Sequence, residues 1–319
     1  MLVGFRRFLR FCSLVVLPAL AVCLAGGVAG AEVTGAVAVV YPDVGEPYRG
    51  VFLKIIEGVE GRLRSRVVTI PLGARPTAQE LGEDLRRHDV RVVVALGRQG
   101  FTAANGLDQK LPVVAGAVVS VPESDSRPMA VHSLAPDPGL LFQRLKSFLP
   151  EIRRVFAVYD PGSSGWQIRL ARDAAKAQGL ELVGTEVSDL KAAARAYRSI
   201  FEMADPHRDA IWLLQDPVGA EESTVLPFVL EEGWTRSVPV FSSNLAHVRR
   251  GALFTLYPDN EELGRRLGTT ALNLLAGGGQ PGVAPLREVL LAVNQRSAHH
   301  LGINVNPRQQ GIDLILPAQ

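Results

Sequence analysis

The sequence is poor in cysteine. Of its 319 residues only Cys12 and Cys23 are cysteines, and residues 32–319 contain none. A chain without cysteine can form no disulfide, no thiolate metal site and no cysteine nucleophile. Its stability must come from burial alone, and about 290 residues are enough to bury a large core.

Concentrated positive charge is also lacking. Three arginines lie in the first 31 residues, and removal of that segment would change the formal net charge from +2 to −1. The rest of the chain has no lysine or arginine run and no basic patch interleaved with aromatic residues. These absences disfavour nucleic-acid binding. Beyond residue 31, no apolar stretch is long enough to span a bilayer.

The N-terminal segment has the three-part layout of an export signal. Positive charge lies between Arg6 and Arg10, an apolar stretch follows over Phe11–Val28, and Ala29-Gly30-Ala31 supplies small residues for a signal peptidase. We predict a secretory signal peptide over residues 1–31 and a periplasmic location for the mature protein.

Two alternatives to cleavage after residue 31 stay open. The apolar stretch approaches the length of an uncleaved membrane anchor, although Pro18, Gly26 and Gly27 weaken it as a helix. A lipoprotein would be modified at Cys23, but the preceding Val22 is bulky where such a site requires a small residue.

After Glu32, short apolar runs alternate with amphipathic segments. Gly35–Tyr41 is rich in valine and predicts a strand buried on both faces, and apolar residues over 52–63 recur at helical spacing. We predict further strands over 66–71, 90–96 and 112–119, and helices over 77–87 and 98–105. Such alternation predicts a parallel sheet covered by helices on both faces.

The pattern then repeats. Residues 121–138 predict an irregular connection, followed by a helix at about 139–149. Strands are expected over 154–159, 181–187, 210–214 and 238–241, with helices over 165–178, 190–204 and 220–232. Two such blocks predict two similar α/β lobes.

The remaining segment is too short for a third domain. It offers a strand over 252–257, a helix over 260–275, a strand over 289–293 and a short helix that ends at Leu301. These elements must complete the two sheets, so the chain crosses between the lobes several times and forms a hinge. We assign residues 32–130 and about 257–284 to the first lobe, and 131–256 and about 285–319 to the second.

Ligands of open parallel sheets bind beyond the carboxyl ends of the strands. The residues that follow the predicted strands are aromatic, hydroxyl-bearing, amide or charged, a set that suits an amphipathic solute such as an amino acid or another carboxylate. Arg98 would favour a carboxylate and Asp216 an ammonium group. The candidate ligand-binding residues are Tyr41, Gly97, Arg98, Gln99, Tyr159, Ser163, Ser164, Asp216, Ser243 and Asn244.

Enzymatic and metal chemistry have weaker support. Gly162–Gly165 lacks the G-x-S-x-G spacing of a nucleophile elbow, and no spacing ties His207 or His247 to it as a base. The side chains of His299 and His300 diverge because the two residues are adjacent on a predicted helix. We therefore expect a binding protein with no catalytic residues, no metal and no cofactor.

Several stretches together resemble a known family. These are Val92–Gly97 with Phe101–Ala104, Leu149-Pro150 with Arg154–Tyr159, Arg250–Leu253, Glu262–Arg265, Leu274–Gly277 and Leu291–Ile303. They are similar to the ABC transporter substrate-binding proteins whose better-known members bind aromatic amino acids. The resemblance covers essentially the whole chain after the signal segment. It implies the type 1 periplasmic binding fold: two Rossmann-like lobes with parallel sheets, joined by a multi-crossover hinge.

The resemblance also implies partners, namely a small-molecule ligand and an ABC permease in the inner membrane. We expect a monomer. The chain departs from the family pattern at Arg98, Ser163-Ser164, Asp216-Pro217 and Ala130–Leu134. Two alternatives follow, a divergent solute specificity for an importer, or a ligand-sensing accessory protein that partners a membrane receptor.

Overall fold

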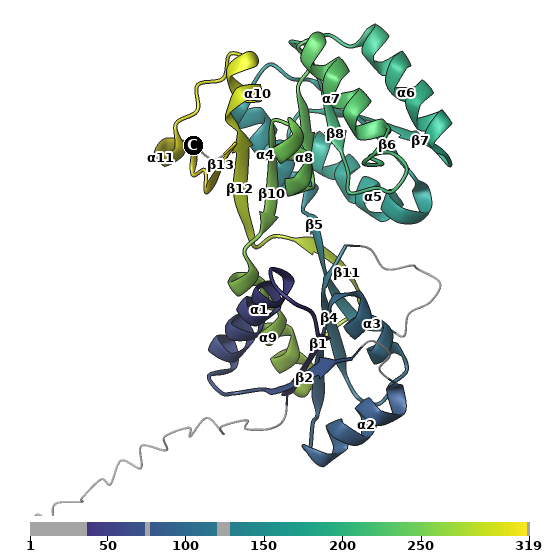
Figure 1. Cartoon of the computed structure of the whole chain (residues 1–319), viewed down its shortest axis with the longest axis vertical. Helices are drawn as coiled ribbons and strands as arrows, with labels where there is room; N and C mark the ends of the chain where they lie inside the picture. The colour runs from purple at the N-terminus through teal and green to yellow at the C-terminus, as the bar shows by residue number, and fades with distance from the viewer. Residues whose placement is uncertain (1–36, 74–76, 120–127, 318–319) are drawn as a thin grey trace, which may run out of the picture. The chain divides into compact units, whose positions relative to one another are not determined.

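A computed structural model describes residues 37–73, 77–119 and 128–317 (Figure 1). The predicted signal peptide lies outside the described residues. From Val33 onward the chain forms one compact unit with two lobes, each built on its own sheet. The α/β class and the two mostly parallel sheets are confirmed.

The first lobe is built on a six-stranded sheet in which every pair is parallel. The strand order is β11-β5-β4-β3-β1-β2. Its strands are β1 (Val37–Pro42), β2 (Val68–Leu72), β3 (Val92–Leu96), β4 (Val113–Val118), β5 (Ala130–Pro136) and β11 (Gly282–Leu286). Its helices are α1 (Tyr48–Leu63), α2 (Ala78–Arg87), α3 (Gly97–Asn105) and α9 (Asn260–Leu275).

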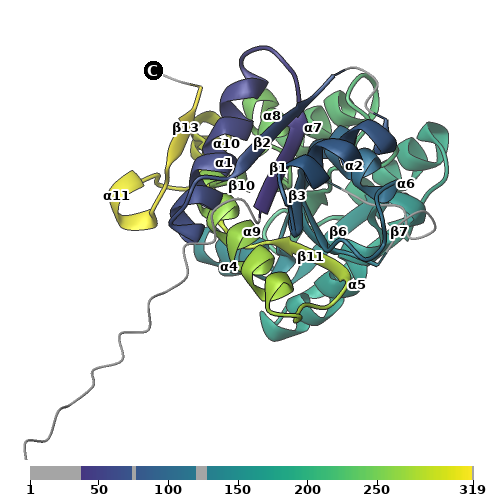
Figure 2. The same ribbon diagram turned by 90° about the horizontal axis from the view of Figure 1, so that it is seen from below.

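Both faces of this sheet are buried, which explains the unbroken apolar runs. In β1, Val37 and Val39 pack under α1 and α9, whereas Ala38 and Val40 pack under α2 and α3. Figure 2 shows α1 and α9 side by side on the face of the sheet that they cover. Helix α2 begins as predicted, because the Thr77 hydroxyl accepts a hydrogen bond from the Glu80 N–H at 3.2 Å.

The second lobe is built on a seven-stranded sheet in the order β13-β12-β10-β9-β8-β6-β7. Its strands are β6 (Arg154–Tyr159), β7 (Glu181–Glu186), β8 (Asp209–Leu213), β9 (Val240–Ser242), β10 (Phe254–Pro258), β12 (Val289–Asn294) and β13 (Leu314–Leu316). Its helices are α4 (Pro138–Phe148), α5 (Pro161–Ala177), α6 (Leu190–Met203), α7 (Val225–Thr235), α8 (Leu245–Arg250), α10 (Gln295–His300) and α11 (Pro307–Gln310). The β10–β12 pair is antiparallel, so this sheet is not purely parallel.

The chain crosses between the lobes three times, from β5 to α4, from β10 to α9 and from β11 to β12. The crossings are bonded to one another. Asp137 N–H donates to Leu286 O at 2.8 Å, and Asp259 N–H donates to Glu288 O at 3.0 Å. The Arg287 guanidinium also pairs with the carboxylate of Asp137. Hydrogen bonds therefore connect the three segments that cross between the lobes.

The prediction of an irregular segment over 121–138 is wrong for residues 130–136, which form β5. Polar residues interrupt the apolar pattern of β5, and they can be buried there because they hydrogen-bond to residues of other elements. The buried Ser133 hydroxyl donates to Val119 O at 2.6 Å, and the buried His132 lies 2.9 Å from the Thr270 hydroxyl. The first sheet thus extends past residue 130, where the predicted lobe division falls; that division stays a prediction.

Two helix boundaries also differ from the prediction. Helix α5 begins at Pro161, four residues early, because Asp160 caps it and proline fits the first turn. Helix α7 begins at Val225 instead of residue 220, because the Glu221 carboxylate binds the N–H groups of Ser223 and Thr224 in a turn that precedes the helix.

Candidate functional site

A cavity of about 520 Å³ lies beyond the carboxyl ends of strands from both sheets. Its first-lobe wall comes from Arg98, at the start of α3, and Val119, which follows β4. Its second-lobe wall comes from the first turn of α5, the segment after β8 and the start of α8. The second-lobe residues are Ser163, Gln215, Asp216, Pro217, Ala220, Glu221, Glu222, Asn244 and His247.

Asp216 organises the second-lobe wall. Its Oδ1 accepts hydrogen bonds from the N–H groups of Val218 at 3.0 Å and Gly219 at 2.7 Å. Its Oδ2 accepts from Asp160 N–H at 3.0 Å and from the Ser164 hydroxyl at 2.6 Å. A carboxylate has about four lone-pair directions, and these four donors use them. The geometry therefore makes Asp216 a bridge between loops and leaves no lone pair for a ligand ammonium group.

The close packing of these two loops also explains why residue 219 is a glycine. A Cβ on Gly219 would lie 2.0 Å from Val158 O, so no other residue fits where this segment passes over the end of β6. Close backbone packing and the buried carboxylate together hold the two loops at a fixed separation.

The turn after β9 is equally well bonded. The Ser243 hydroxyl accepts a hydrogen bond from the Trp212 indole at 2.9 Å, and Ser243 N–H donates to Leu213 O. Asn244 caps α8, because its Oδ1 accepts from Ala246 N–H at 2.9 Å. Ser243 is thus part of the support, whereas the Asn244 side chain lines the cavity.

In the first lobe, Gly97 has φ of +70°, and a Cβ there would lie 3.3 Å from both Phe52 and Pro42. This glycine allows the chain to turn directly from β3 into α3. The next residue, Arg98, is exposed and lines the cavity, whereas the Gln99 amide donates to Gly73 O. The half-buried Tyr41 packs on Phe52 with its ring centroid 6.3 Å away.

Tyr159 belongs to the core. It is 2% exposed, packs under α5 and donates its hydroxyl to Glu186 Oε1 at 3.0 Å. Burial, with the Glu186 bond, raises the pKa of this phenol. The aromatic face expected from this residue is turned away from the cavity.

The structure therefore brings together Arg98, Ser163, Asp216 and Asn244 from the predicted set. The others lie beside the cavity or beneath it and do not line it. The cavity-lining residues missed are Val119, Gln215, Pro217, Ala220, Glu221, Glu222 and His247. Gln215 directly follows the predicted strand 210–214, so the rule that ligands bind beyond the carboxyl ends of parallel strands could have identified it. His247 lies on α8, a six-residue helix too short to be detected by its periodicity.

The charged side chains that line the cavity differ in whether they already form hydrogen bonds or ion pairs within the protein. Glu221 is engaged, since hydrogen bonds from the Ser223 hydroxyl and N–H, and then from the next two N–H groups, lower its pKa to about 2. The side chains of Arg98 and Glu222 have no hydrogen-bond or ionic partner among the described residues. One cation from the first lobe and one anion from the second are thus available to a ligand.

His247 is buried, and its ring Nδ1 lies 2.8 Å from the Ser242 hydroxyl. Burial, and then the nearby charge of Arg250, lower its pKa to about 4. The imidazole is therefore neutral at physiological pH.

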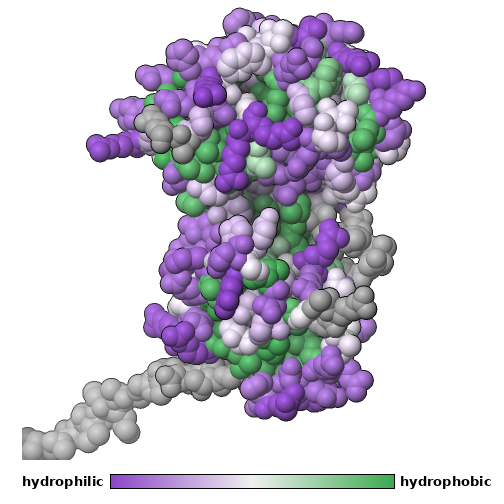
Figure 3. All heavy atoms as spheres, viewed as in Figure 1, coloured by the Kyte–Doolittle hydropathy of each residue, from purple (hydrophilic) through white to green (hydrophobic). Residues whose placement is uncertain are grey.

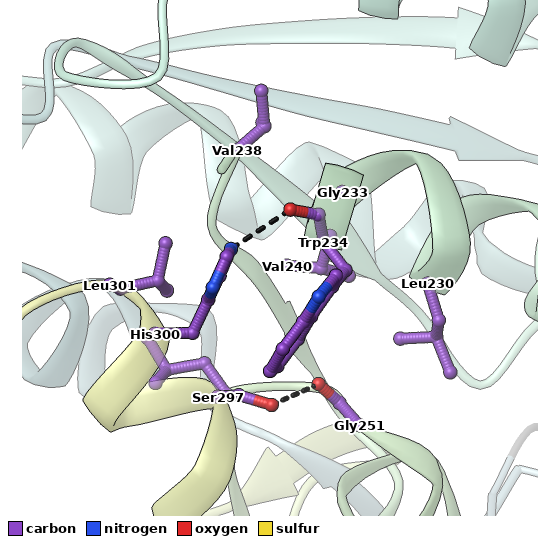
Figure 4. A pocket seen from close by; sticks show the side chains of 10 residues that line it. Leu230, Gly233, Trp234, Val238, Val240, Gly251, Ser297, His300 and Leu301 are labelled. Atoms are coloured by element: carbon purple, nitrogen blue, oxygen red, sulfur yellow. Dashed lines mark hydrogen bonds between the residues drawn. The ribbon is translucent and has the colours of Figure 1, made fainter. Parts of the chain in front are cut away.

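A second pocket lies between α7 and α10 in the second lobe (Figure 4). The rings of Trp234 and His300 stack there with centroids 4.0 Å apart, and His300 Nε2 lies 2.9 Å from Trp234 O. Its free volume of about 20 Å³ holds no more than a water molecule. This pocket is too small for an organic solute.

Two further findings concern the described ranges only. Within 37–73, 77–119 and 128–317, no helix combines the length and hydropathy that a membrane crossing requires. In the same part of the chain, no three histidine, cysteine or acidic side chains converge as metal ligands. Polar side chains cover most of the face shown in Figure 3.

The model of the ABC transporter substrate binding protein family matches residues 76–309, which is most of the chain. The chain belongs to that family. No curated protein matches the sequence significantly. Proteins of this family bind solutes.

Solved structures of this fold include a ligand-free, open substrate-binding protein with adhesive properties from Clostridium difficile. It is 18% identical, with a TM-score of 0.61, and the match covers 87% of this chain and 98% of that one. A domain from Streptococcus pneumoniae in complex with L-Trp is 18% identical, with a TM-score of 0.51 over 88% and 100% of the two chains. A conserved domain protein from Vibrio cholerae is also 18% identical, with a TM-score of 0.53 over 88% and 99%. This substrate-binding protein therefore has the type 1 periplasmic binding fold.

Proposed function

We propose that this protein captures a small amphipathic solute, an amino acid or a related carboxylate, between its lobes and delivers it to an ABC importer. The observation that carries the proposal is the cavity of about 520 Å³, which has Arg98 on one wall and Glu222 on the other. Neither of these two side chains has a hydrogen-bond or ionic partner within the described part of the chain. This volume lies within the usual range for small-molecule sites. Opposite charges on facing walls suit a zwitterion.

Each wall has its own role. Arg98 and the free N–H groups at the start of α3 form a site for a carboxylate on the first lobe. The second-lobe wall is held by Asp216 and by the turn at Ser243, so it is organised before the solute arrives. A solute that bridges the walls stabilises the closed arrangement of the three-crossover hinge, and a permease can recognise that arrangement.

The proposal places the mature protein in the periplasm as a monomer, after removal of residues 1–31 as a signal peptide. N-terminal sequencing of the protein exported by cells tests the cleavage directly. Scattering or sedimentation of the exported form tests the monomer.

The test of binding is calorimetry on the chain from residue 32, with a panel of amino acids and small carboxylates. At least one solute is expected to bind and to raise the melting temperature by linkage. The Arg98→Ala variant should bind it at least tenfold more weakly, whereas Arg91→Ala, an exposed arginine at the opposite end of β3, should bind it normally. Absence of binding across the panel would overturn the proposal.

Delivery is tested separately, by uptake of the bound solute in cells with and without the gene. Loss of uptake supports the importer role. Binding with unchanged uptake would instead favour the accessory sensing role.

A further inference from the structure

His247 is a buried polar residue in the wall of the cavity, and its surroundings fix which of its ring nitrogens carries the proton. The side chain is 2% exposed, and its residual surface faces the cavity that it lines. Nδ1 faces Ser242 inside the lobe, at 2.8 Å. Nε2, on the other side of the ring, has no hydrogen-bond partner among the described residues.

The tautomer follows from the bonds made by Ser242. A serine hydroxyl has one proton to donate and two lone pairs that accept. The Ser242 oxygen lies 3.1 Å from Leu213 O, which can only accept, and 3.0 Å from Asn244 N–H, which can only donate. All three short contacts of this oxygen are satisfied only if its proton goes to Leu213 O and His247 Nδ1–H donates to it. The lone pair of His247 is then on Nε2.

This lone pair is present under physiological conditions. The pKa of His247 is lowered to about 4, first by burial and then by Arg250, so Nε2 stays unprotonated at neutral pH. An unsatisfied acceptor in a largely buried wall is costly unless the ligand supplies a donor. Sites of this kind reject analogues that lack the donor more strongly than apolar pockets reject a change of size.

We propose that His247 is a specificity-determining residue that accepts a hydrogen bond from a neutral N–H or O–H group of the solute. The preferred class is then an amino acid whose side chain ends in such a donor, with its carboxylate at Arg98. This inference rests on the proposed function and narrows it, because Arg98 and Glu222 alone would accept any amino acid.

The probes are pairs of solutes that differ in one donor: tyrosine and phenylalanine, tryptophan and 1-methyltryptophan, threonine and valine. For at least one pair, calorimetry should show that the member with the donor binds at least tenfold more tightly. The His247→Phe variant, which keeps a ring but has no acceptor, should reduce that preference to below threefold. His247→Gln, whose amide oxygen can accept, should restore part of it. The control is His299→Phe, an exposed histidine that does not line the cavity.

Nitrogen NMR of the free protein gives a readout that needs no ligand. The His247 ring should be the Nδ1–H tautomer at pH 7, and the signal of Nε2 should move on binding of the tighter member. The Nε2–H tautomer, or equal binding within every pair, overturns this inference and leaves the proposed function standing. Failure of all six probes to bind overturns this inference, whereas absence of binding across the whole panel of amino acids and small carboxylates overturns the proposed function as well.

Discussion

The hydroxyl of Ser164 donates to Oδ2 of Asp216 over 2.6 Å, and this bond joins the first turn of α5 to the segment that follows β8. Both residues are almost completely buried. The bond shows why Ser164, expected to touch a ligand, instead supports the cavity wall, and why the carboxylate of Asp216, which lines the cavity, is already fully hydrogen-bonded within the protein. The residues next to them in sequence, Ser163 and Gln215, also line the cavity.

Replacement of Asp216 by Asn should destabilise the protein by about 2–4 kcal/mol, because an NH₂ group then faces donors inside a buried site. Urea unfolding measures this loss. The control is Glu222→Gln, which changes the same charge on an exposed side chain and should alter the free energy of unfolding by less than about 0.5 kcal/mol. A similar stability in both variants would contradict the bridging role.

The contact between α1 and α9 should tolerate no side chain at two glycines. A Cβ on Gly58 would lie 2.0 Å from Glu261 O, and a Cβ on Gly264 would lie 2.0 Å from Ile55 O. Alanine at either position should therefore cost about 2–3 kcal/mol or more. Gly61 is on the same helix with no atom within 4 Å of an added Cβ, so Gly61→Ala should stabilise by up to about 1 kcal/mol. Thermal unfolding of the three variants distinguishes packing from helix propensity.

Stability should fall as the pH decreases from about 6.5 to 4. His132 and His247 both have pKa values lowered to about 4, mainly by burial, with Arg266 and Arg250 as the second causes. An unfolded histidine titrates near 6.5, so in this window the unfolded chain binds protons that the folded chain does not. At pH 5 each histidine should cost about 1–2 kcal/mol relative to pH 7.5.

Urea unfolding at the two pH values, on the wild type and on the His132→Gln/His247→Gln double variant, checks this dependence. The double variant should lose less stability on acidification. An identical loss in both proteins would assign the acid sensitivity to other groups.

Arg154 and Asp209 should stabilise the amino-terminal edge of the second sheet. Arg154 Nε lies 2.8 Å from Oδ1 and Nη2 lies 2.6 Å from Oδ2 of an Asp209 that is completely buried. Arg154→Ala should cost roughly 2 kcal/mol, below the usual cost of breaking a buried pair, because the arginine side chain is 37% exposed. Arg154→Lys should recover part of this loss, since it restores one bond. As a control, Arg153→Ala at the neighbouring position should change the free energy of unfolding, measured by urea denaturation, only slightly.

Much of the fold could be predicted because strands that are buried on both faces of a sheet appear in the sequence as short, continuous apolar runs. Runs such as VVVAL in β3 and AIWL in β8 are apolar throughout and give the strands directly. Strand β5 could not be found in this way. Its His132 and Ser133 are satisfied by Thr270 and Val119, and these partners are close only in the folded chain.

Local patterns in the sequence were enough to predict the alternation of strands and helices, the two lobes with several crossings, and the edge of each sheet where a ligand would lie. All of these follow from local periodicity and from the geometry of parallel strands. Which residues at that edge line the cavity depends on how the folded segments pack against one another. Asp216 and Ser164 bond to each other and Tyr159 turns into the core, while Glu222 and His247 join the wall from segments whose direction no local pattern specifies. The reason is that orientation of a loop side chain depends on hydrogen bonds between segments distant in sequence, and these bonds exist only once the chain has folded.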